Sequence, residues 1–201
     1  MGPTFELAYC WWALDVAQTW RERRGLPRDE DWDRALHRLA RPSISDGTYD
    51  AVAAPPGSGE PGRTTRHDHP SLLGALGVVP QTPLIDPATM RRTLEDVLSD
   101  WDWVSAWGWD FPMMAMCATR LGDGRAAVDA LLRPAAKNTY LPNGHNLQVA
   151  NRLPLYLPGN GGLLMAVALM AAGWDGCTVD RPGFPTDGSW AVAWEGFAPR
   201  P

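Results

Sequence analysis

Three segments of this sequence are apolar around the full circumference of the helix that each would form, and each follows a long polar loop. They cover residues 72–79, 111–121 and 161–172. A helix without a polar face has to be surrounded by protein, whereas the segments between these three carry one apolar stripe and one charged face. Buried inner helices that alternate with half-exposed outer helices are typical of an α/α toroid. The sequence therefore predicts an all-α fold, a partial (α/α)6 toroid with about three to four helical hairpins and an irregular C-terminal tail.

Further helices are predicted over residues 4–24, 30–40 and 124–132, and from Asp86 onward, where an N-cap aspartate precedes Pro87. The first of them is expected to be almost entirely buried at its start. Four tryptophans at helical spacing in the first two helices are assigned to the core. They are Trp11, Trp12, Trp20 and Trp32.

The chain is long enough for one domain, which is predicted over residues 1–201. Its 45% hydrophobic and 20% charged residues are typical of a globular protein. Residues 42–66 are rich in Pro, Gly and Ser and are predicted to form a loop with a mobile centre and a turn at Asp46-Gly47.

Charge and apolar length argue against two classes of partner. A net charge of −5 gives no support for binding to nucleic acid or to an anionic membrane. The apolar run at residues 161–172 is shorter than the roughly 20 residues that span a bilayer. No signal peptide is visible at Met1, so a cytoplasmic location is expected if Met1 is the true start, and an exported one if the chain is truncated. The oligomeric state is left open.

The three cysteines lack the spacing of a metal site or a disulfide framework. They are Cys10, Cys117 and Cys177, and the simplest interpretation is buried free thiols. The loop histidines also lack the i,i+4 spacing of helical metal ligands. Neither a metal nor a cofactor is predicted.

The long loops all lead into inner helices, while the links that leave inner helices are short. Long ordered loops in compact domains are usually functional, so the functional edge is expected at the N-terminal ends of the inner helices. The chain also has 11 Trp against 4 Phe and 4 Tyr. A tryptophan ring offers a flat apolar face and one N–H donor, which suits the C–H face of a pyranose. An oligosaccharide or glycoside is therefore the expected ligand.

The residues predicted to bind this ligand are polar or aromatic and lie in the three long loops. They are Asp68, His69, Asp102, Trp103, Trp107, Trp109, Asn143, His145, Asn146 and Asn160. Each has a structural alternative: the asparagines also cap turns or helices, Asn160 above all, and the tryptophans also pack in cores. Asp68 is equally compatible with capping a helix or orienting a histidine, and Asp102 with an outward position.

Asp110 is the candidate catalytic base, because it stands where an inner helix begins, between aromatic neighbours. An inverting glycosidase needs one protonated carboxyl group and one carboxylate, about 6.5–9.5 Å apart. The alternative is that Asp110 only caps the N-terminus of its helix.

Several long motifs resemble the late part of the catalytic domain of six-hairpin (α/α)6 glycosidases, the glycoside hydrolase family 65-like proteins. They occupy residues 103–116 with 120–122, 138–146, 155–164, 172–176, 182–185 and 194–196. The resemblance covers nearly the whole chain and places its first residues in the middle of the family's domain. It implies that a β-sandwich domain, the first hairpins and the general-acid Glu lie upstream.

A weaker likeness connects residues 67–72 and 158–162 with the α-fucosidases of family 95. Pro158 stands where those enzymes have their catalytic aspartate, so that base is not carried over.

The expected function is thus that of the C-terminal fragment of a glycoside hydrolase-like catalytic domain. Such a domain hydrolyses a glycosidic bond by acid/base chemistry of the inverting type, and the fragment is expected to be inactive alone because its general acid lies upstream. The alternative is a non-catalytic carbohydrate-binding or interaction module. A phosphorylase is a third possibility, but no Lys/Arg/Ser cluster at the loops argues for it.

Overall fold

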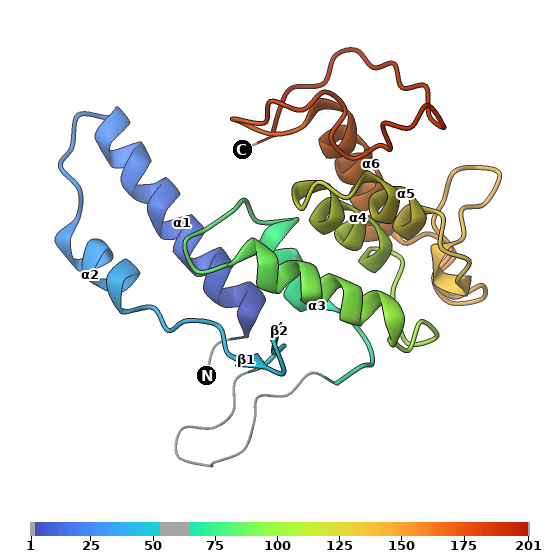
Figure 1. Cartoon of the computed structure of the whole chain (residues 1–201), viewed down its shortest axis with the longest axis horizontal. Coiled ribbons are helices and arrows are strands. Elements are labelled where there is room, and N and C mark those ends of the chain that lie inside the picture. Colours follow the sequence, from blue (N-terminus) through green and yellow to red (C-terminus); the bar gives the residue numbers. More distant parts are fainter. Residues whose placement is uncertain (1–2, 53–64, 201) are drawn as a thin grey trace.

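The computed structural model describes residues 3–52 and 65–200, and within these ranges the regular elements are helices apart from one two-stranded sheet (Figure 1). The α-helices are α1 (Thr4–Arg23), α2 (Glu30–Arg38), α3 (Pro87–Ser99), α4 (Asp110–Arg120), α5 (Gly124–Leu131) and α6 (Leu157–Ala172). The short elements are the 3-10 helices η1 (Ser71–Leu76) and η2 (Ala136–Asn138) and the strands β1 (Ile44–Ser45) and β2 (Thr48–Tyr49). The predicted all-α class is confirmed.

The helices form an inner series and an outer series. In the inner series α1 packs on η1, η1 on α4, and α4 on α6. In the outer series α2 covers α1, α3 covers η1 and α4, and α5 covers α4 and α6. Figure 1 shows α1 and α6 on opposite sides of the molecule. The alternation is the one that the apolar pattern predicts, while the toroid itself stays a prediction.

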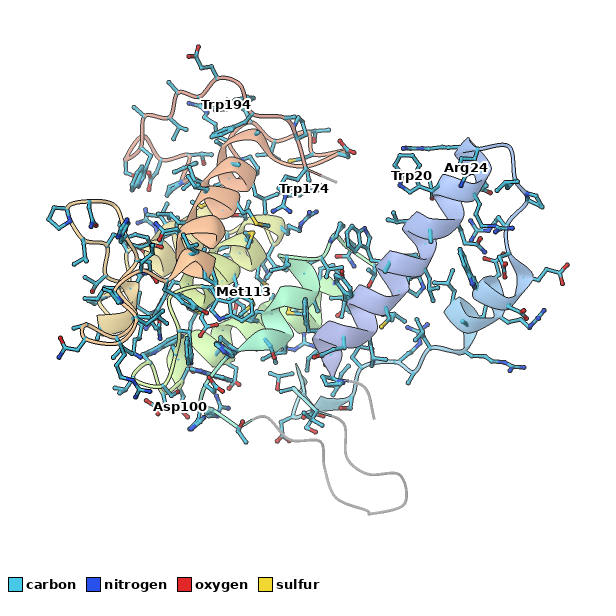
Figure 2. All side chains as sticks on the ribbon, turned by 180° about the vertical axis from the view of Figure 1, so that it is seen from behind. Trp20, Arg24, Asp100, Met113, Trp174 and Trp194 are labelled. Atoms are coloured by element: carbon cyan, nitrogen blue, oxygen red, sulfur yellow. The ribbon has the colours of Figure 1, made fainter. Side chains whose placement is uncertain are left out.

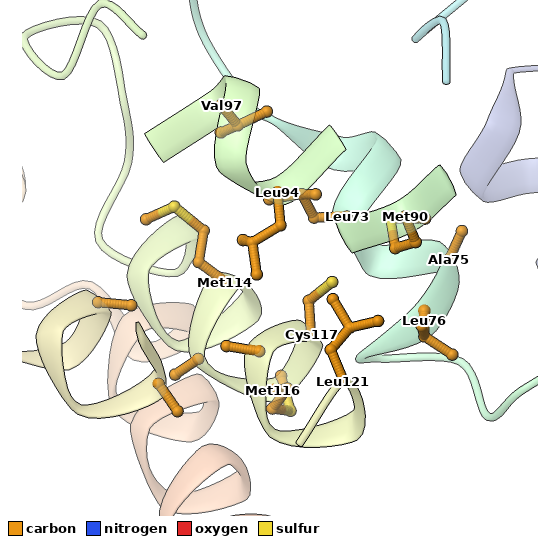
Figure 3. Packing of buried hydrophobic residues seen from close by; sticks show 14 of the residues in the cluster. Leu73, Ala75, Leu76, Met90, Leu94, Val97, Met114, Met116, Cys117 and Leu121 are labelled. Carbon is orange, nitrogen blue, oxygen red and sulfur yellow. The ribbon is translucent and has the colours of Figure 1, made fainter. Parts of the chain in front are cut away.

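The core is centred on α4, in which every residue from Asp110 to Thr119 is buried. Figure 3 shows its inner side chains, among them Met114 and Cys117, facing those of η1 and α3. Full burial of one such apolar side chain contributes about 1.5–3 kcal/mol. The position and the burial of α4 confirm the prediction of an inner helix at residues 111–121.

The inner segment at 72–79 is shorter than predicted, because only Ser71–Leu76 is helical and the form is 3-10. Two glycines in this segment lower its α-helix propensity and allow close packing. A Cβ on Gly74 would lie 3.0 Å from the Phe5 ring, and one on Gly77 would lie 2.7 Å from the backbone nitrogen of Cys117. The close contact of η1 with α1 and α4 thus requires glycine.

Several apolar side chains that were expected in the core are exposed. On α6, Leu164 and Met165 are 72% and 38% exposed. On α1, Trp20 is 57% exposed, and Figure 2 shows it near the end of α1 that lies farther from Met113 of α4.

The tryptophan assignments need the same correction. Trp32 is 37% exposed, whereas Trp11 and Trp12 are half-buried. Arginine guanidinium groups lie over the rings of Trp20 and Trp32 instead of apolar partners. An apolar stripe in the sequence predicts which face of a helix can be buried. It does not predict that another element of the chain packs against that face.

Of the three cysteines, Cys117 is buried, Cys177 is half-buried and Cys10 is exposed, and none forms a disulfide. Cys10 was expected to be buried and lies instead on the uncovered side of α1. No helix in the described part of the chain is long and apolar enough to cross a membrane.

The region predicted as a loop at 42–66 contains the hairpin β1–β2. Its turn is Asp46-Gly47, as predicted, with φ of 51° and 83°, the positive values that a two-residue hairpin turn requires. Tyr49 attaches the hairpin to α3, because its hydroxyl accepts a hydrogen bond from the Asp86 backbone N–H and its own N–H donates to Thr93 Oγ1. The predicted mobile centre falls mainly on residues 53–64, outside the described residues.

Two glycine substitutions test the packing of the inner helices. We expect Gly77→Ala to lower the free energy of unfolding by about 1–3 kcal/mol, because the new Cβ meets backbone that has to shift. Gly161→Ala is the control: that helical position has open space, so alanine should raise stability by about 0.5–1 kcal/mol. Urea unfolding of both variants gives these values, and a neutral Gly77→Ala would contradict the close η1–α4 contact.

Candidate functional site

The loop before η1 is tied to the loop before α4 at three points. The Asp102 N–H donates to the Arg66 carbonyl at 3.0 Å, and the Trp101 indole N–H donates to the Asp68 carbonyl at 2.9 Å. Ser105 Oγ accepts from the Asp68 N–H at 2.7 Å. Asp68 has a φ of 67°, in the left-handed region that non-glycine residues rarely adopt. This backbone is therefore fixed where it leads to His69.

His69 and Asp110 meet at the N-terminal ends of η1 and α4, although they are 41 residues apart. Nδ1 of His69 lies 2.9 Å from Oδ1 of Asp110, and Oδ2 accepts a hydrogen bond from the Trp107 N–H at 2.7 Å. The Asp110 side chain is completely buried. The N-cap of α4 is Trp109, whose side chain makes no capping hydrogen bond to the helix. Asp110 thus holds a histidine and a loop, rather than acting as the simple cap of the alternative interpretation.

Burial changes the proton affinity of this carboxyl group. Removal from water penalises its charged form and raises the pKa of Asp110 from 3.8 to about 6, although the Trp107 N–H and His69 both act in the opposite direction. A carboxyl group that titrates near neutral pH next to an imidazole is the arrangement expected of acid/base chemistry.

Two tryptophan rings lie against His69, and a tyrosine ring lies against one of them. The ring centroids of Trp107 and Trp109 lie 5.7 and 5.0 Å from that of His69, and Tyr156 lies 5.5 Å from Trp107. All four side chains are half-buried. The ammonium group of Lys137 lies 5.7 Å from the Trp107 ring. These five residues form what we call the aromatic mouth.

Trp103 does not join the aromatic mouth, although its alternation with Trp107 and Trp109 led to that expectation. Its ring packs beside Phe111, and the guanidinium of Arg133 lies 4.2 Å from its centroid. The loop bends between Trp103 and Trp107, so the alternation of an extended chain does not persist.

The asparagines among the predicted ligand-binding residues hold loops together. Asn146 is fully buried, its amide nitrogen donates to the Lys137 and Thr139 carbonyls, and its oxygen lies against Gly108 and Gly159. Asn160 accepts from the Asn146 N–H and donates to a loop carbonyl.

Asn143 and His145 are linked to each other in the exposed turn of the same loop, and Asp102 is exposed with its carboxylate bonded to the Val104 N–H. The structure therefore brings Asp68, His69, Trp107, Trp109 and Asp110 together and leaves the remaining candidates outside the mouth.

Three residues near the mouth were missed by sequence reasoning. Tyr156 and Lys137 belong to the mouth itself, and Gln148 supports it by accepting from the Gly108 N–H at 2.9 Å. The signal for Tyr156 was its place immediately before an inner helix. Lys137 and Gln148 lie in irregular segments that carry no such signal.

Within the described ranges, no three His, Cys, Asp or Glu side chains are grouped to hold a metal ion. Comparison with known proteins found no matching family model, no similar curated protein and no similar solved structure. The glycosidase resemblance therefore stays a prediction.

The buried carboxyl group predicts a pH-dependent stability. Because the pKa of Asp110 is higher in the folded chain than the ordinary 3.8, the folded state keeps its proton where the unfolded state has lost it. The free energy of unfolding should fall by about 3 kcal/mol as the pH rises from about 3 to about 7.

Asp110→Asn should abolish this part of the pH dependence, and Asp102→Asn, on the exposed loop, should retain it. Urea unfolding across this pH range measures the difference between each variant and the wild type. A difference for Asp110→Asn that stays constant with pH would show that burial does not raise the pKa of this group.

Proposed function

We propose that this chain is carbohydrate-active, as the C-terminal part of a glycoside hydrolase-like catalytic domain that cleaves a glycosidic bond by acid/base chemistry of the inverting type. The observation that carries the proposal is the His69–Asp110 pair beneath the aromatic mouth. The pair lies at the edge of the inner helices where the long loops indicate a functional site.

The mouth has the chemistry that a sugar requires. The half-buried rings of Trp107, Trp109 and Tyr156 offer apolar faces and edges to the C–H groups of a pyranose. The exposed carboxylate of Asp68 and the ammonium of Lys137 provide an acceptor and a donor for hydroxyl groups. An oligosaccharide or glycoside is thus the ligand class that fits best.

Asp110 does not act as a base that takes a proton directly from water. Its carboxyl group is enclosed and bonded to Trp107 and His69, so a water or a sugar hydroxyl does not contact Asp110 directly. We therefore assign Asp110 the role of a positioning residue and proton acceptor behind His69. The general acid is the Glu that the family resemblance places upstream, and the 201-residue chain is accordingly inactive alone.

Two exposed faces support the interpretation as part of a larger domain. Leu157, Leu164 and Met165 of α6 and Tyr9 and Trp20 of α1 are among the most exposed large apolar side chains of these helices. Apolar surface at both ends of a curved helical series is what the neighbouring hairpins of a toroid would cover.

A carbohydrate-binding module without chemistry is the second candidate. The complete burial of Asp110 favours it, because a rigidly bonded carboxyl group can also serve only to orient the ring of His69. Neither candidate predicts hydrolysis by the chain alone. Turnover of a glycoside by these residues alone, abolished by Asp110→Asn, would contradict both the fragment and the binding module.

Sugar binding is tested by removing the central ring of the mouth. We expect Trp107→Ala to weaken binding of an oligosaccharide on the order of tenfold or more, because a stacking surface worth about 1.4 kcal/mol is lost. Trp20→Ala is the matched control, since this exposed ring lies on α1. A glycan array identifies the ligand and calorimetry gives the affinities. Equal losses in both variants, or no binding of any glycan by the wild type, would contradict the proposal.

A further inference from the structure

One nitrogen of His69 is shared by two neighbours with different demands. Nδ1 lies 2.9 Å from the Asp110 carboxyl group and 3.0 Å from Nε1 of Trp109, whose indole N–H can only donate. If Nδ1 carries a proton, it satisfies an ionised Asp110 but leaves the Trp109 N–H without an acceptor. If Nδ1 carries a lone pair, both Trp109 and a protonated Asp110 can donate to it.

The other nitrogen of His69 faces a second carboxylate. Nε2 lies 3.6 Å from Oδ1 of Asp68, whose side chain is about half exposed at 52%. This distance exceeds a direct hydrogen bond, so proton transfer requires a small rotation of the exposed Asp68 side chain toward Nε2. The left-handed backbone of Asp68, fixed by Ser105 and Trp101, directs this carboxylate toward the imidazole. The imidazole therefore stands between a buried and an exposed carboxyl group.

We propose that Asp68, His69 and Asp110 form a proton relay from the aromatic mouth to the interior, in which Trp109 stabilises the state that has received the proton. Before transfer, Asp68 and Asp110 are ionised and His69 carries its proton on Nδ1. Asp68 takes a proton from a water or hydroxyl at the mouth and passes it to Nε2, and the Nδ1 proton moves to Asp110. After transfer Asp68 is ionised again, His69 is neutral with its proton on Nε2, and Asp110 is neutral.

Burial of Asp110 and the Trp109 N–H favour this final state, while the Trp107 N–H favours the ionised carboxylate. The transfer neutralises a carboxylate that burial destabilises, and the freed lone pair of Nδ1 accepts from Trp109. The groups that face the pair are the Trp107 N–H, which donates to Asp110, and Tyr156, whose own pKa is raised by burial and by the Asp110 charge. Lys137 lies over the outer ring of Trp107.

The relay adds a proton path to the proposed function. It depends on that function only for the source of the proton. In glycoside hydrolysis that source is the water whose oxygen bonds to the anomeric carbon, while the general acid protonates the departing oxygen. The arrangement of protons within the relay can be measured without any sugar, so its failure and the failure of sugar binding are separate results.

Nitrogen NMR of the His69 ring tests the relay in the folded chain. As the pH falls through about 6, the pKa of Asp110, we expect Nδ1 to change from a protonated to an unprotonated nitrogen and Nε2 to change in the opposite sense. The Trp109 indole proton should shift downfield over the same range. Protonation of both ring nitrogens below the midpoint would mean that the proton stays on His69, and would overturn the relay.

Substitutions assign the two outer residues. Trp109→Phe should leave both ring nitrogens protonated at low pH, because the donor that favours the lone pair is gone, whereas Trp103→Phe should behave as wild type. Asp68→Asn should slow the exchange of the His69 Nε2 proton with solvent by about tenfold. Asp102→Asn should leave this exchange rate unchanged. Unchanged exchange in Asp68→Asn would remove Asp68 from the relay, and an unchanged titration in Trp109→Phe would remove Trp109.

Discussion

The structure depends on the complete burial of α4. This helix packs on η1, α3, α5 and α6, so it links η1 to α6 within the inner series. The same burial extends to its first residue, where Asp110 lies inside the protein with a completely buried side chain. A buried carboxyl group needs partners, and the loops that lead into α4 and η1 provide them as the Trp107 N–H and His69. The core and the site are therefore consequences of one packing arrangement.

Much of the helical architecture was predictable because burial leaves a periodic trace in the sequence. α2, α3, α4 and α5 begin within one or two residues of their expected positions, three of them at N-cap aspartates that bond to the first turn. The 3-10 form of η1 was not predictable, since it depends on the approach of Gly77 to the backbone of Cys117. The exposure of α6 could not be read from its composition either, because the element that would cover an apolar face is not encoded in that face.

The candidate site was predictable as a list of residues and not as a geometry. Asp68, His69, Trp107, Trp109 and Asp110 all precede buried helices, and that position identified them. The pairing of His69 with Asp110 is a contact between residues far apart in the sequence, and the periodicity of apolar residues does not predict such contacts. Side chains with the same local signal had other roles, as the asparagines that fix the loop before α6 show. A site assembled from several loops can be located by their position, while the partner of each side chain follows only from the folded chain.

The most direct test of the account is to record the tryptophan indole N–H signals of the folded chain while an oligosaccharide is titrated. The account predicts that the signals of Trp107 and Trp109 move together and saturate, while that of Trp20 at the far end of α1 stays in place. Saturable shifts confined to Trp20 or to the tail residues Trp190 and Trp194, or no shift with any glycan, would contradict a sugar site at the aromatic mouth.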